Sequence, residues 1–328
     1  MQTANQHNTP AQPVLAVDIG GTKTAAALIT PEGRIVSRAQ EPTRQNGPQD
    51  GIQQISGLLE NVLHASGHSL GDIAGIGIGI PAVLEPETDF VIWGPNLTDW
   101  RNVNLRGALQ EYFQKPVCVE YDGHTAVLGE WWLGAGRGHQ SMVDIIIGTG
   151  IGGGMVLDGH LIRGLNRLAG AVGWFAFHHE TADISQQDRS LGFWEARTAG
   201  PGIARRAKTL LEGGKYSTSR LANCPQGPSA RDVFEAAQDG DALAVQIAHE
   251  EADLLGLGIA NIVSMVNPEI IILGGSVGTN AGFLIPRITE IVNRYAQPIS
   301  ARSVRIAPST LGAEAGLLGA AYGMYLRL

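Results

Sequence analysis

The sequence is poor in cysteine and in positive charge, and it has no long apolar run. Its 328 residues include only two cysteines, Cys118 and Cys224, which argues against a disulfide framework and against a thiolate zinc site. Lysine and arginine total 23 against 31 acidic residues, a net charge of −8, and this balance argues against a nucleic-acid partner. No stretch approaches the roughly 18 apolar residues of a membrane span.

The first dozen residues lack the features of a targeting segment. Residues 1–12 are polar, and no apolar stretch follows them as it would in a signal peptide. They are expected to form a flexible tail. Together with the missing membrane span, this predicts a cytoplasmic protein.

Glycine, in contrast, is abundant and clustered. The 44 glycines exceed the average share of about 7 %, and many directly follow β-branched runs, where a tight turn or a close ligand would need them. Two clusters separate pairs of expected strands: strand 14–17, turn 18–23 and strand 24–29, then strand 142–147, turn 148–154 and strand 155–157. A third strand is expected after each pair, at 35–38 and at 160–163. The pattern recurs roughly 130 residues later, which predicts a duplicated structural half rather than a short solenoid repeat.

The rest of the chain alternates expected helices and strands. Apolar residues at helical spacing predict a helix at 51–65. Further helices are expected at 105–113, 125–133, 194–206, 230–237, 242–265, 283–295 and 313–326. Short β-branched runs predict strands at 73–80, 117–120, 269–273 and 304–307. No linker rich in proline and serine separates the halves, so we expect an α/β protein of two lobes packed around a cleft.

The two glycine turns are candidate phosphate sites. A glycine-rich turn exposes backbone N–H groups and forms a nest for anions, so one turn from each half could hold a polyphosphate. The contributing residues would be Asp18 (near a bound Mg²⁺), Gly20, Gly21, Thr22 and Lys23 in the first turn, and Gly148, Thr149, Gly150 and Gly152 in the second. Neither turn matches a P-loop, and the second leads into a strand, which argues against a Rossmann site. The alternative is two hairpins that bind nothing.

In combination, these motifs resemble the ROK family of sugar kinases over residues 14–324, essentially the whole chain. The matching segments are 17–23 (VDIGGTK) and 147–154 (IGTGIGGG) for the two phosphate motifs, 77–81 with 94–97 for the sugar loops, 268–275 for the adenosine motif, and 312–321 for the closing helix. The resemblance implies a two-lobed, actin-like (ribonuclease-H-type) ATPase fold with duplicated mixed-sheet domains around a cleft. The expected lobes are a small N-terminal one, 13–120 with 313–328, and a larger C-terminal one, 121–312.

The same resemblance implies ATP and Mg²⁺ as cofactors, a sugar-like substrate and a homodimer. Gly274 and Gly275 would complete the ATP site. Gly79 and Asn96 would contact the sugar, although Asn96 could instead be a turn residue following Pro95.

Residues 119–130 (VEYDGHTAVLGE) resemble the family segment that carries the catalytic base, with Asp122 in the position of the base. A carboxylate at a strand end can take the proton of a sugar hydroxyl as the γ-phosphoryl group leaves ATP. The alternative is that Asp122 caps the helix expected from residue 125. Asparagines of the family are replaced here by Tyr121 and His124. Both are expected to contact substrate, with a structural role as the alternative for His124.

One segment departs from the family pattern. Many members carry Ala-Gly-Glu-Ile-Gly-His, in which the Glu binds the sugar and the His binds sugar and zinc, whereas this chain has AGAVGW at 169–174. The family's downstream cysteines are missing from 185–195. His178 and His179 alone cannot supply the three or four ligands of tetrahedral zinc, so no zinc is expected.

The altered segment bears on the substrate. Trp174 could stack on a ring or pack in the core, and Glu195 aligns with a sugar-contacting glutamate or is an exposed helix acid. Lost hydrogen-bond partners penalise sugars with hydroxyls on that side. We therefore expect ATP-dependent phosphorylation of an acceptor other than plain glucose: a glycoside, an anhydro-, deoxy- or amino sugar, or a cyclitol. The alternative is a sugar-binding regulatory protein without turnover. A DNA-binding repressor is disfavoured because only about a dozen residues precede the first strand.

Overall fold

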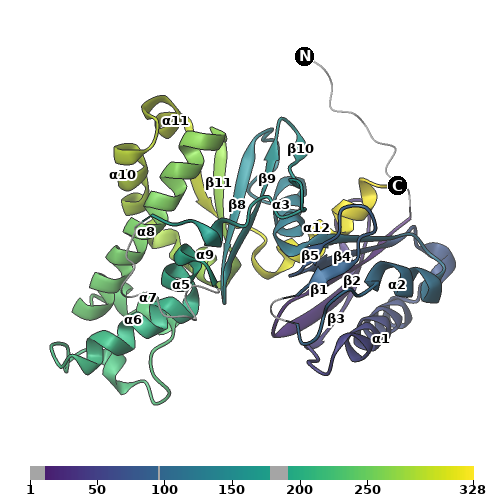
Figure 1. Cartoon of the computed structure of the whole chain (residues 1–328), viewed down its shortest axis with the longest axis horizontal. Coiled ribbons are helices and arrows are strands. Elements are labelled where there is room, and N and C mark those ends of the chain that lie inside the picture. The colour runs from purple at the N-terminus through teal and green to yellow at the C-terminus, as the bar shows by residue number, and fades with distance from the viewer. Residues whose placement is uncertain (1–11, 95–96, 178–190) are drawn as a thin grey trace. The chain divides into compact units, whose positions relative to one another are not determined.

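The computed structural model describes residues 12–94, 97–177 and 191–328, so the expected tail at 1–12 lies outside them except for Gln12 (Figure 1). The chain divides into two compact units. One consists of Met1–Arg137, Leu161–Ala169 and Glu314–Leu328, and the other of Gly138–His160 and Gly170–Ala313. Among the described residues, no helix is both long enough and apolar enough to cross a membrane.

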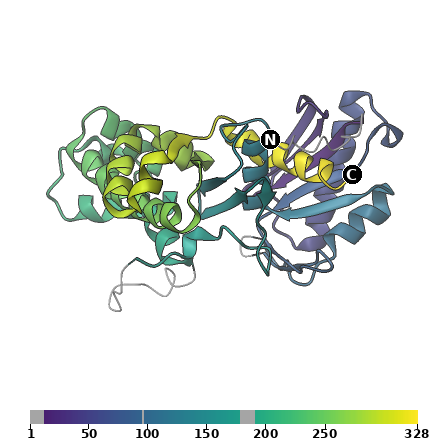
Figure 2. The same cartoon turned by 90° about the horizontal axis from the view of Figure 1, so that it is seen from above.

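The first unit contains a five-stranded mixed sheet with helices packed on it. The strand order is β3 (Ile35–Pro42), β2 (Lys23–Ile29), β1 (Val14–Ile19), β4 (Ile76–Ile80) and β7 (Val117–Tyr121). Strands β1, β2 and β3 are antiparallel, whereas β1, β4 and β7 run parallel. The helices are α1 (Pro48–Ser66), α2 (Leu105–Phe113), α3 (Asp122–Trp132) and α12 (Ala315–Tyr325), and β5 (Val83–Leu84) pairs with β6 (Val91–Trp93). Helix α12, yellow in Figure 2, packs along β1 and β4.

Strand β4, with the sequence IGIGI, explains how both faces of this sheet are covered. Because side chains alternate along a strand, its three isoleucines point into the apolar cluster to which α1 contributes Ile55 and Leu58. The glycines face the other way. A Cβ at Gly77 would lie only 1.9 Å from the Ala320 carbonyl oxygen of α12, so the absence of a side chain lets that helix lie directly against the strand.

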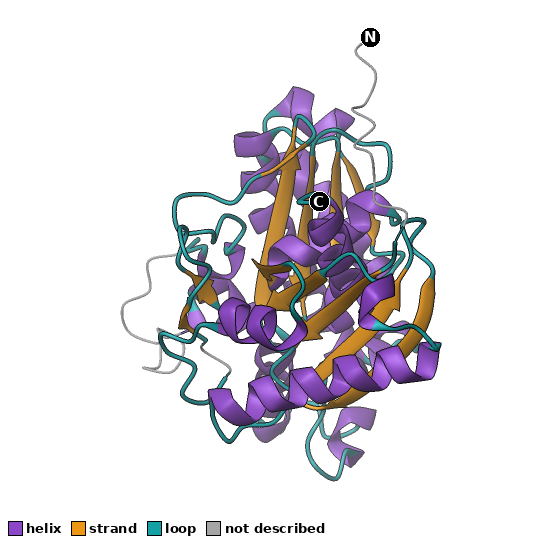
Figure 3. Cartoon of the chain, turned by 90° about the vertical axis from the view of Figure 1, so that its right-hand side faces the viewer, coloured by secondary structure: helices purple, strands orange, loops and turns teal. Residues whose placement is uncertain are grey.

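The second unit repeats the sheet and adds more helices. The strand order is β10 (His160–Leu161), β9 (Ile151–Leu157), β8 (Met142–Ile147), β11 (Ile270–Gly274) and β12 (Arg305–Pro308). Strands β8 and β9 are antiparallel, and β8, β11 and β12 run parallel. The helices are α5 (Phe193–Thr198), α6 (Gly200–Glu212), α7 (Ala230–Gln238), α8 (Ala242–Val266), α9 (Gly275–Gly278), α10 (Ile285–Tyr295) and α11 (Pro298–Ser303). Figure 3 shows all described strands of the chain in orange and all described helices in purple.

The two sheets share one connectivity, which confirms the predicted α/β fold and its duplication. In each, two strands joined by the glycine turn are antiparallel, and two later strands add in parallel beside the first. The turns between β1 and β2 and between β8 and β9 are therefore equivalent positions of the two units.

Several expected bounds differ from the structure; the second glycine turn, for example, is shorter than expected because β9 begins at Ile151. The boundary between units falls after Arg137 rather than after residue 120, because α3 packs against α12 within the first unit. Helix α3 begins at Asp122 rather than at residue 125. The helix expected at 194–206 is two helices, since Ala199 between them has an extended backbone (φ −72°, ψ 161°) and Pro201 stands in the first turn of α6.

The contact between α3 and α12 is made by backbone atoms. A Cβ at Gly319 of α12 would lie 1.5 Å from the Thr125 carbonyl oxygen of α3. That distance is far inside van der Waals contact, and the obstacle is backbone, which no rotamer change can move. A glycine at this position thus sets the separation of the two helices.

We predict that Gly319→Ala lowers the free energy of unfolding by about 3 kcal/mol or more, because α3 and α12 must separate to admit the methyl group. Urea unfolding measures the loss. The matched control is Gly57→Ala in α1, where a Cβ would meet nothing within 4 Å. There the better helix propensity of alanine should raise stability by about 0.5–1 kcal/mol. Equal effects of the two substitutions would contradict the packing account.

Candidate functional site

Asp18 lies at the carboxyl end of β1, where the first glycine turn begins. It is in register with Gly79 of β4, and its half-buried carboxyl group faces the start of α12, since a Cβ at Gly316 would lie 2.7–2.8 Å from the carboxyl atoms. Burial raises the pKa of Asp18 to about 6, although the positive charges of Lys23 and Arg38 oppose the shift. The carboxyl group is therefore held where a cation would be favourable.

Asp122 follows β7 and is the first residue of α3. Its Oδ1 accepts a hydrogen bond from the backbone N–H of Gly123 at 2.8 Å. Burial raises the pKa of Asp122 to about 7, the negative charge of Asp18 raises it further, and the hydrogen bond from Gly123 opposes both. Tyr121, not Asp122, is the N-cap residue of α3, so the capping alternative is not what the structure shows. A half-buried carboxylate with a pKa near neutrality suits a general base.

The first glycine turn is held by hydrogen bonds to its carbonyl oxygens, and its tip is exposed. The Thr43 hydroxyl donates to the Gly20 carbonyl oxygen at 2.6 Å, the Thr43 N–H donates to Thr22 at 3.0 Å, and the Gln45 amide donates to Gly21 at 3.1 Å. Gly21, Thr22 and Lys23 are all exposed. The turn thus has a fixed shape with an accessible ammonium group, as a phosphate site requires.

His124 is fully buried, which favours the structural role over the expected substrate contact. Its Nδ1 lies 3.4 Å from Oε2 of Glu120, and its Nε2 lies 3.1 Å from the carbonyl oxygen of Ala169. Both ring nitrogens are therefore occupied by protein oxygens. The half-buried Tyr121 packs edge-to-face on the imidazole, with ring centroids 5.3 Å apart.

Glu120, two residues before Asp122, anchors an ionic network under the end of β7. Its Oε1 accepts from Nε of Arg163 at 2.9 Å and from Nη2 of Arg327 at 2.7 Å. Burial alone would raise the pKa of Glu120, but the hydrogen bond from His124 and the two arginines outweigh it and lower the pKa to about 2. Arg327 also approaches Asp89, at 3.7 Å. This network joins the C-terminal residues to the strand that presents Asp122.

In the second unit, the glycine turn is tied to Glu195 and to the start of α6. Oε2 of Glu195 accepts from the Ile151 N–H at 2.7 Å, and the Gly200 N–H donates to the Gly148 carbonyl oxygen at 2.8 Å. Burial raises the pKa of Glu195, and the bond from Ile151 opposes the shift. Glu195 therefore stabilises the turn through this hydrogen bond. Thr149, at the tip of the turn, is exposed.

Beside this turn lies a pocket of about 710 Å³, within the range of small-molecule sites. Gly148 and Thr149 line it together with the first residues of α6 and α7, where helical N–H groups favour an anion. The other lining residues include Arg231, Phe234, Glu235, Ser276, Val277 and Asn280. Gly275, expected at the ATP site, has φ 75° and directly precedes Ser276. Of this unit's expected ATP residues, Gly148 and Thr149 thus line the pocket.

Trp174 is 59 % exposed, which argues against the core-packing alternative. Asn96, His178, His179 and residues 185–190 lie outside the described residues. Across 12–94, 97–177 and 191–328, no cluster of three or more His, Cys, Asp or Glu side chains could hold a metal ion. The absence of zinc remains a prediction.

Several pocket and site residues were not singled out in the sequence. Ser229 and Asp232 form a capping box that starts α7, and the spacing of this pair is a readable helix-start signal. Gly316 stood within the closing-helix motif, but its position against Asp18 has no local signature. Arg231 and Phe234 reach the pocket only because α7 packs near the turn.

The comparisons with known proteins agree with these features. The model of the ROK family matches residues 14–324. A glucokinase of Halalkalibacterium halodurans is 36 % identical over 310 residues, 93 % of this chain and 92 % of the relative. The crystal structure of a ROK family glucokinase from Streptomyces griseus in complex with glucose and AMPPNP has a TM-score of 0.77 and 30 % identity, covering 94 % of this chain and 98 % of that one. A xylose repressor of Caldicellulosiruptor bescii is 28 % identical over 82 % of this chain, but only 66 % of the repressor is covered.

The duplicated sheets and paired glycine turns are those of the actin-like ATPase fold of the ROK sugar kinases. The chain belongs to the ROK family. Because its relatives include both sugar kinases and repressors, membership of the family is compatible with a catalytic and with a regulatory function.

We predict that Glu120→Gln lowers the free energy of unfolding by about 3 kcal/mol at pH 7, because Arg163 and Arg327 lose a buried carboxylate. A folded-state pKa below the unfolded value of 4.5 stabilises the protein above pH 4.5 and loses that effect as the pH falls toward about 2. The cost of the substitution should therefore shrink in that window. Urea unfolding at a series of pH values measures it.

The control for this series is Glu212→Gln. The Glu212 side chain is 66 % exposed and approaches only Lys208, at 4.0 Å, so its replacement should change the free energy of unfolding by less than about 0.5 kcal/mol. A cost of Glu120→Gln that is the same at pH 7 and at about pH 3.5 would show that the ionised carboxylate is not the source of the effect.

Proposed function

We propose that this chain transfers the γ-phosphoryl group of ATP to a hydroxyl of a sugar or sugar-like molecule. The observation that carries the proposal is Asp122, a half-buried carboxylate at the β7–α3 junction whose pKa is raised to about 7. Membership of the ROK family and 36 % identity to a glucokinase support it. A purely structural aspartate would gain nothing from a raised pKa, since burying it costs stability at neutral pH.

In the proposed reaction Asp122 acts as the general base. Its carboxylate takes the proton of the acceptor hydroxyl while the hydroxyl oxygen bonds to the γ-phosphorus of ATP. The bond from that phosphorus to the bridging oxygen breaks, and ADP leaves with the electron pair. A base with a pKa near 7 is ionised in part at neutral pH and is also basic enough to accept the proton.

The nucleotide would be held by the two glycine turns. Gly20, Gly21, Thr22 and Lys23 would contact phosphate oxygens from one unit. Gly148, Thr149, Gly150, Gly152, Gly274 and Gly275 would do so from the other, with the base and ribose in the pocket between α6 and α7. Phe234 offers that pocket an aromatic surface. Mg²⁺ would neutralise charge on the phosphates, and the raised pKa of Asp18, with Asp122 nearby, fits a site where a divalent cation relieves repulsion.

We further propose an acceptor other than plain glucose. Ala171 and Trp174 replace a carboxylate and an imidazole of the family pattern, and the exposed Trp174 presents an apolar ring instead. Such a surface suits a sugar that lacks a hydroxyl there, or that carries an apolar substituent, because a buried hydroxyl without a partner costs affinity. Gly79, Asn96, Tyr121 and Glu195 stay proposed contacts of this acceptor. A homodimer and a cytoplasmic location are likewise proposals.

The alternative is a sugar-binding regulatory protein on the same fold. The losses at Ala171 and Trp174 favour it, and repressors among the relatives show that the fold serves regulation. The two candidates differ in turnover: a kinase consumes ATP in the presence of its acceptor, whereas a regulatory protein binds the sugar and leaves ATP intact.

The test is an acceptor panel with ATP and Mg²⁺, read by product mass. The panel contains glucose, deoxy-, amino and anhydro-hexoses, alkyl glucosides and cyclitols. We expect at least one acceptor other than glucose to gain a phosphoryl group with the highest kcat/KM. Asp122→Asn should lower kcat on that acceptor by about 10²–10⁴-fold without lowering the melting temperature, and Glu212→Gln should retain wild-type kcat.

The possible failures are distinguishable. Glucose as the best acceptor by a wide margin would refute the acceptor proposal and leave the kinase. Sugar binding without any phosphorylated product would favour the regulatory protein. Wild-type kcat for Asp122→Asn would exclude the base role.

A further inference from the structure

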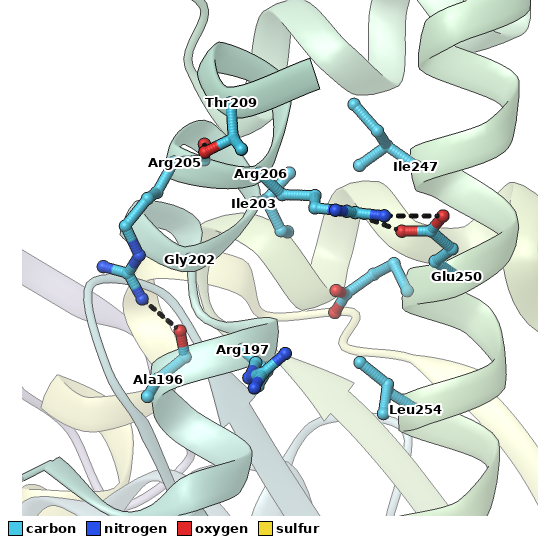
Figure 4. Close-up of a pocket in the computed structure, with 11 residues that line it drawn as sticks. Ala196, Arg197, Gly202, Ile203, Arg205, Arg206, Thr209, Ile247, Glu250 and Leu254 are labelled. Carbon is cyan, nitrogen blue, oxygen red and sulfur yellow. Dashed lines mark hydrogen bonds and ion pairs between the residues drawn. The ribbon is translucent and has the colours of Figure 1, made fainter. Parts of the chain in front are cut away.

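A second pocket in the Gly138–His160 and Gly170–Ala313 unit lies where α5, α6 and α8 meet (Figure 4). Its volume is about 510 Å³, and its walls are Ala196 and Arg197 of α5, five residues of α6 (Gly202, Ile203, Arg205, Arg206, Thr209), and four of α8 (Ile247, Glu250, Glu251, Leu254). None of these residues has a part in the proposed phosphoryl transfer. The pocket combines an apolar lining with an unusual number of ionisable groups.

Glu251 is a buried carboxyl group in this lining whose hydrogen-bonding capacity is not satisfied by the described residues. Its side chain is 3 % exposed, and its Oε1 has no hydrogen-bond partner among the described residues. Burial raises the pKa of Glu251 well above its usual range, which favours the neutral acid. A neutral carboxyl group donates one hydrogen bond and accepts another. Leaving the hydrogen bond of the buried Oε1 unmade costs about 1–3 kcal/mol, so a ligand that supplies a partner would recover that energy.

The arginines around Glu251 are not equivalent. Arg206 is held by Glu250 through two hydrogen bonds, of 2.9 and 3.1 Å, drawn as dashed lines in Figure 4. Arg205 donates to the Ala196 carbonyl oxygen at 2.7 Å. Arg197 has an exposed side chain that stacks on Phe193, and it has no carboxylate partner among the described residues. Arg197 is thus the cation that an incoming anion would engage.

The charge balance of the lining also points to an anion. Within the lining, Arg206 is paired with Glu250 and the carboxyl group of Glu251 is neutral, so the positive charge of Arg197 has no carboxylate partner among the described residues. A phosphate monoester carries a charge of about −1.5 to −2 at neutral pH, and guanidinium binds its oxygens in a planar, forked geometry. The neutral carboxyl group suits a hydroxyl, which both donates and accepts.

We propose that this pocket is a binding site for a small phosphorylated polyol, with Arg197 on the phosphate and Glu251 on a hydroxyl. The site is separate from the proposed nucleotide pocket, which other residues line. Two of its lining residues, Ala196 and Arg197, belong to the same helix as Glu195, which accepts a hydrogen bond from the Ile151 N–H of the glycine turn. A ligand in the pocket would therefore contact α5, the helix that holds this turn through Glu195.

The test is calorimetric titration of glycerol 3-phosphate into the full-length protein. Mg²⁺ and a saturating non-hydrolysable ATP analogue are present, so that phosphate groups cannot occupy the proposed nucleotide site. We expect saturable binding by the wild type. Arg197→Met and Glu251→Leu should each weaken it by about tenfold or more, whereas Glu251→Gln, which keeps one donor and one acceptor, should stay within about threefold.

The matched control is Arg302→Met in α11, which removes the same charge from the same unit far from the lining residues in sequence. It should leave the affinity unchanged. Glu251→Leu removes an unpartnered polar group, so its melting temperature should not fall; if that variant fails to fold, the comparison of Arg197→Met with Arg302→Met decides. No binding up to about 10 mM, or equal affinity of Arg197→Met and Arg302→Met, overturns the proposal.

Discussion

The repulsion between two half-buried carboxylates, Asp18 and Asp122, is a cost that the rest of the first unit must offset. Parallel strands β1 and β7 each end at one of them, and partial burial keeps both pKa values high. Two carboxyl groups with raised pKa values lower the stability of the folded protein at neutral pH, so other contacts must offset that cost. The backbone contact of α12 with α3, which only a glycine at 319 permits, and the network on Glu120 are such contacts.

Much of the fold could be predicted from the sequence because its signals are local. Runs of β-branched residues and the helical spacing of apolar residues depend on neighbours a few positions apart, and both turns are marked by glycine. The duplication followed from the same local pattern occurring twice. The break between α5 and α6 has a local signal too, Gly200-Pro201, although one helix was expected across it.

The site was predictable only where a motif marks it. The partners of Glu120 lie 43 and 207 residues away, and no local pattern connects such positions. His124 lay within the catalytic motif, but its burial depends on Ala169, whose carbonyl oxygen reaches it from a distant segment. Nothing local distinguishes Glu251 from the other polar residues of its helix, and only packing shows that its Oε1 is buried without a partner among the described residues. Whether Trp174 packs inward or outward was equally beyond the sequence.

The most direct test of the account is to titrate the Asp122 carboxyl group by ¹³C NMR in the wild type and in Asp18→Asn, without nucleotide or Mg²⁺. Asp122→Asn identifies the resonance. We predict a pKa of about 7 in the wild type and a lower value in Asp18→Asn, because the neighbouring negative charge is gone. A wild-type pKa near the ordinary 3.8, or one that Asp18→Asn does not change, would contradict the account.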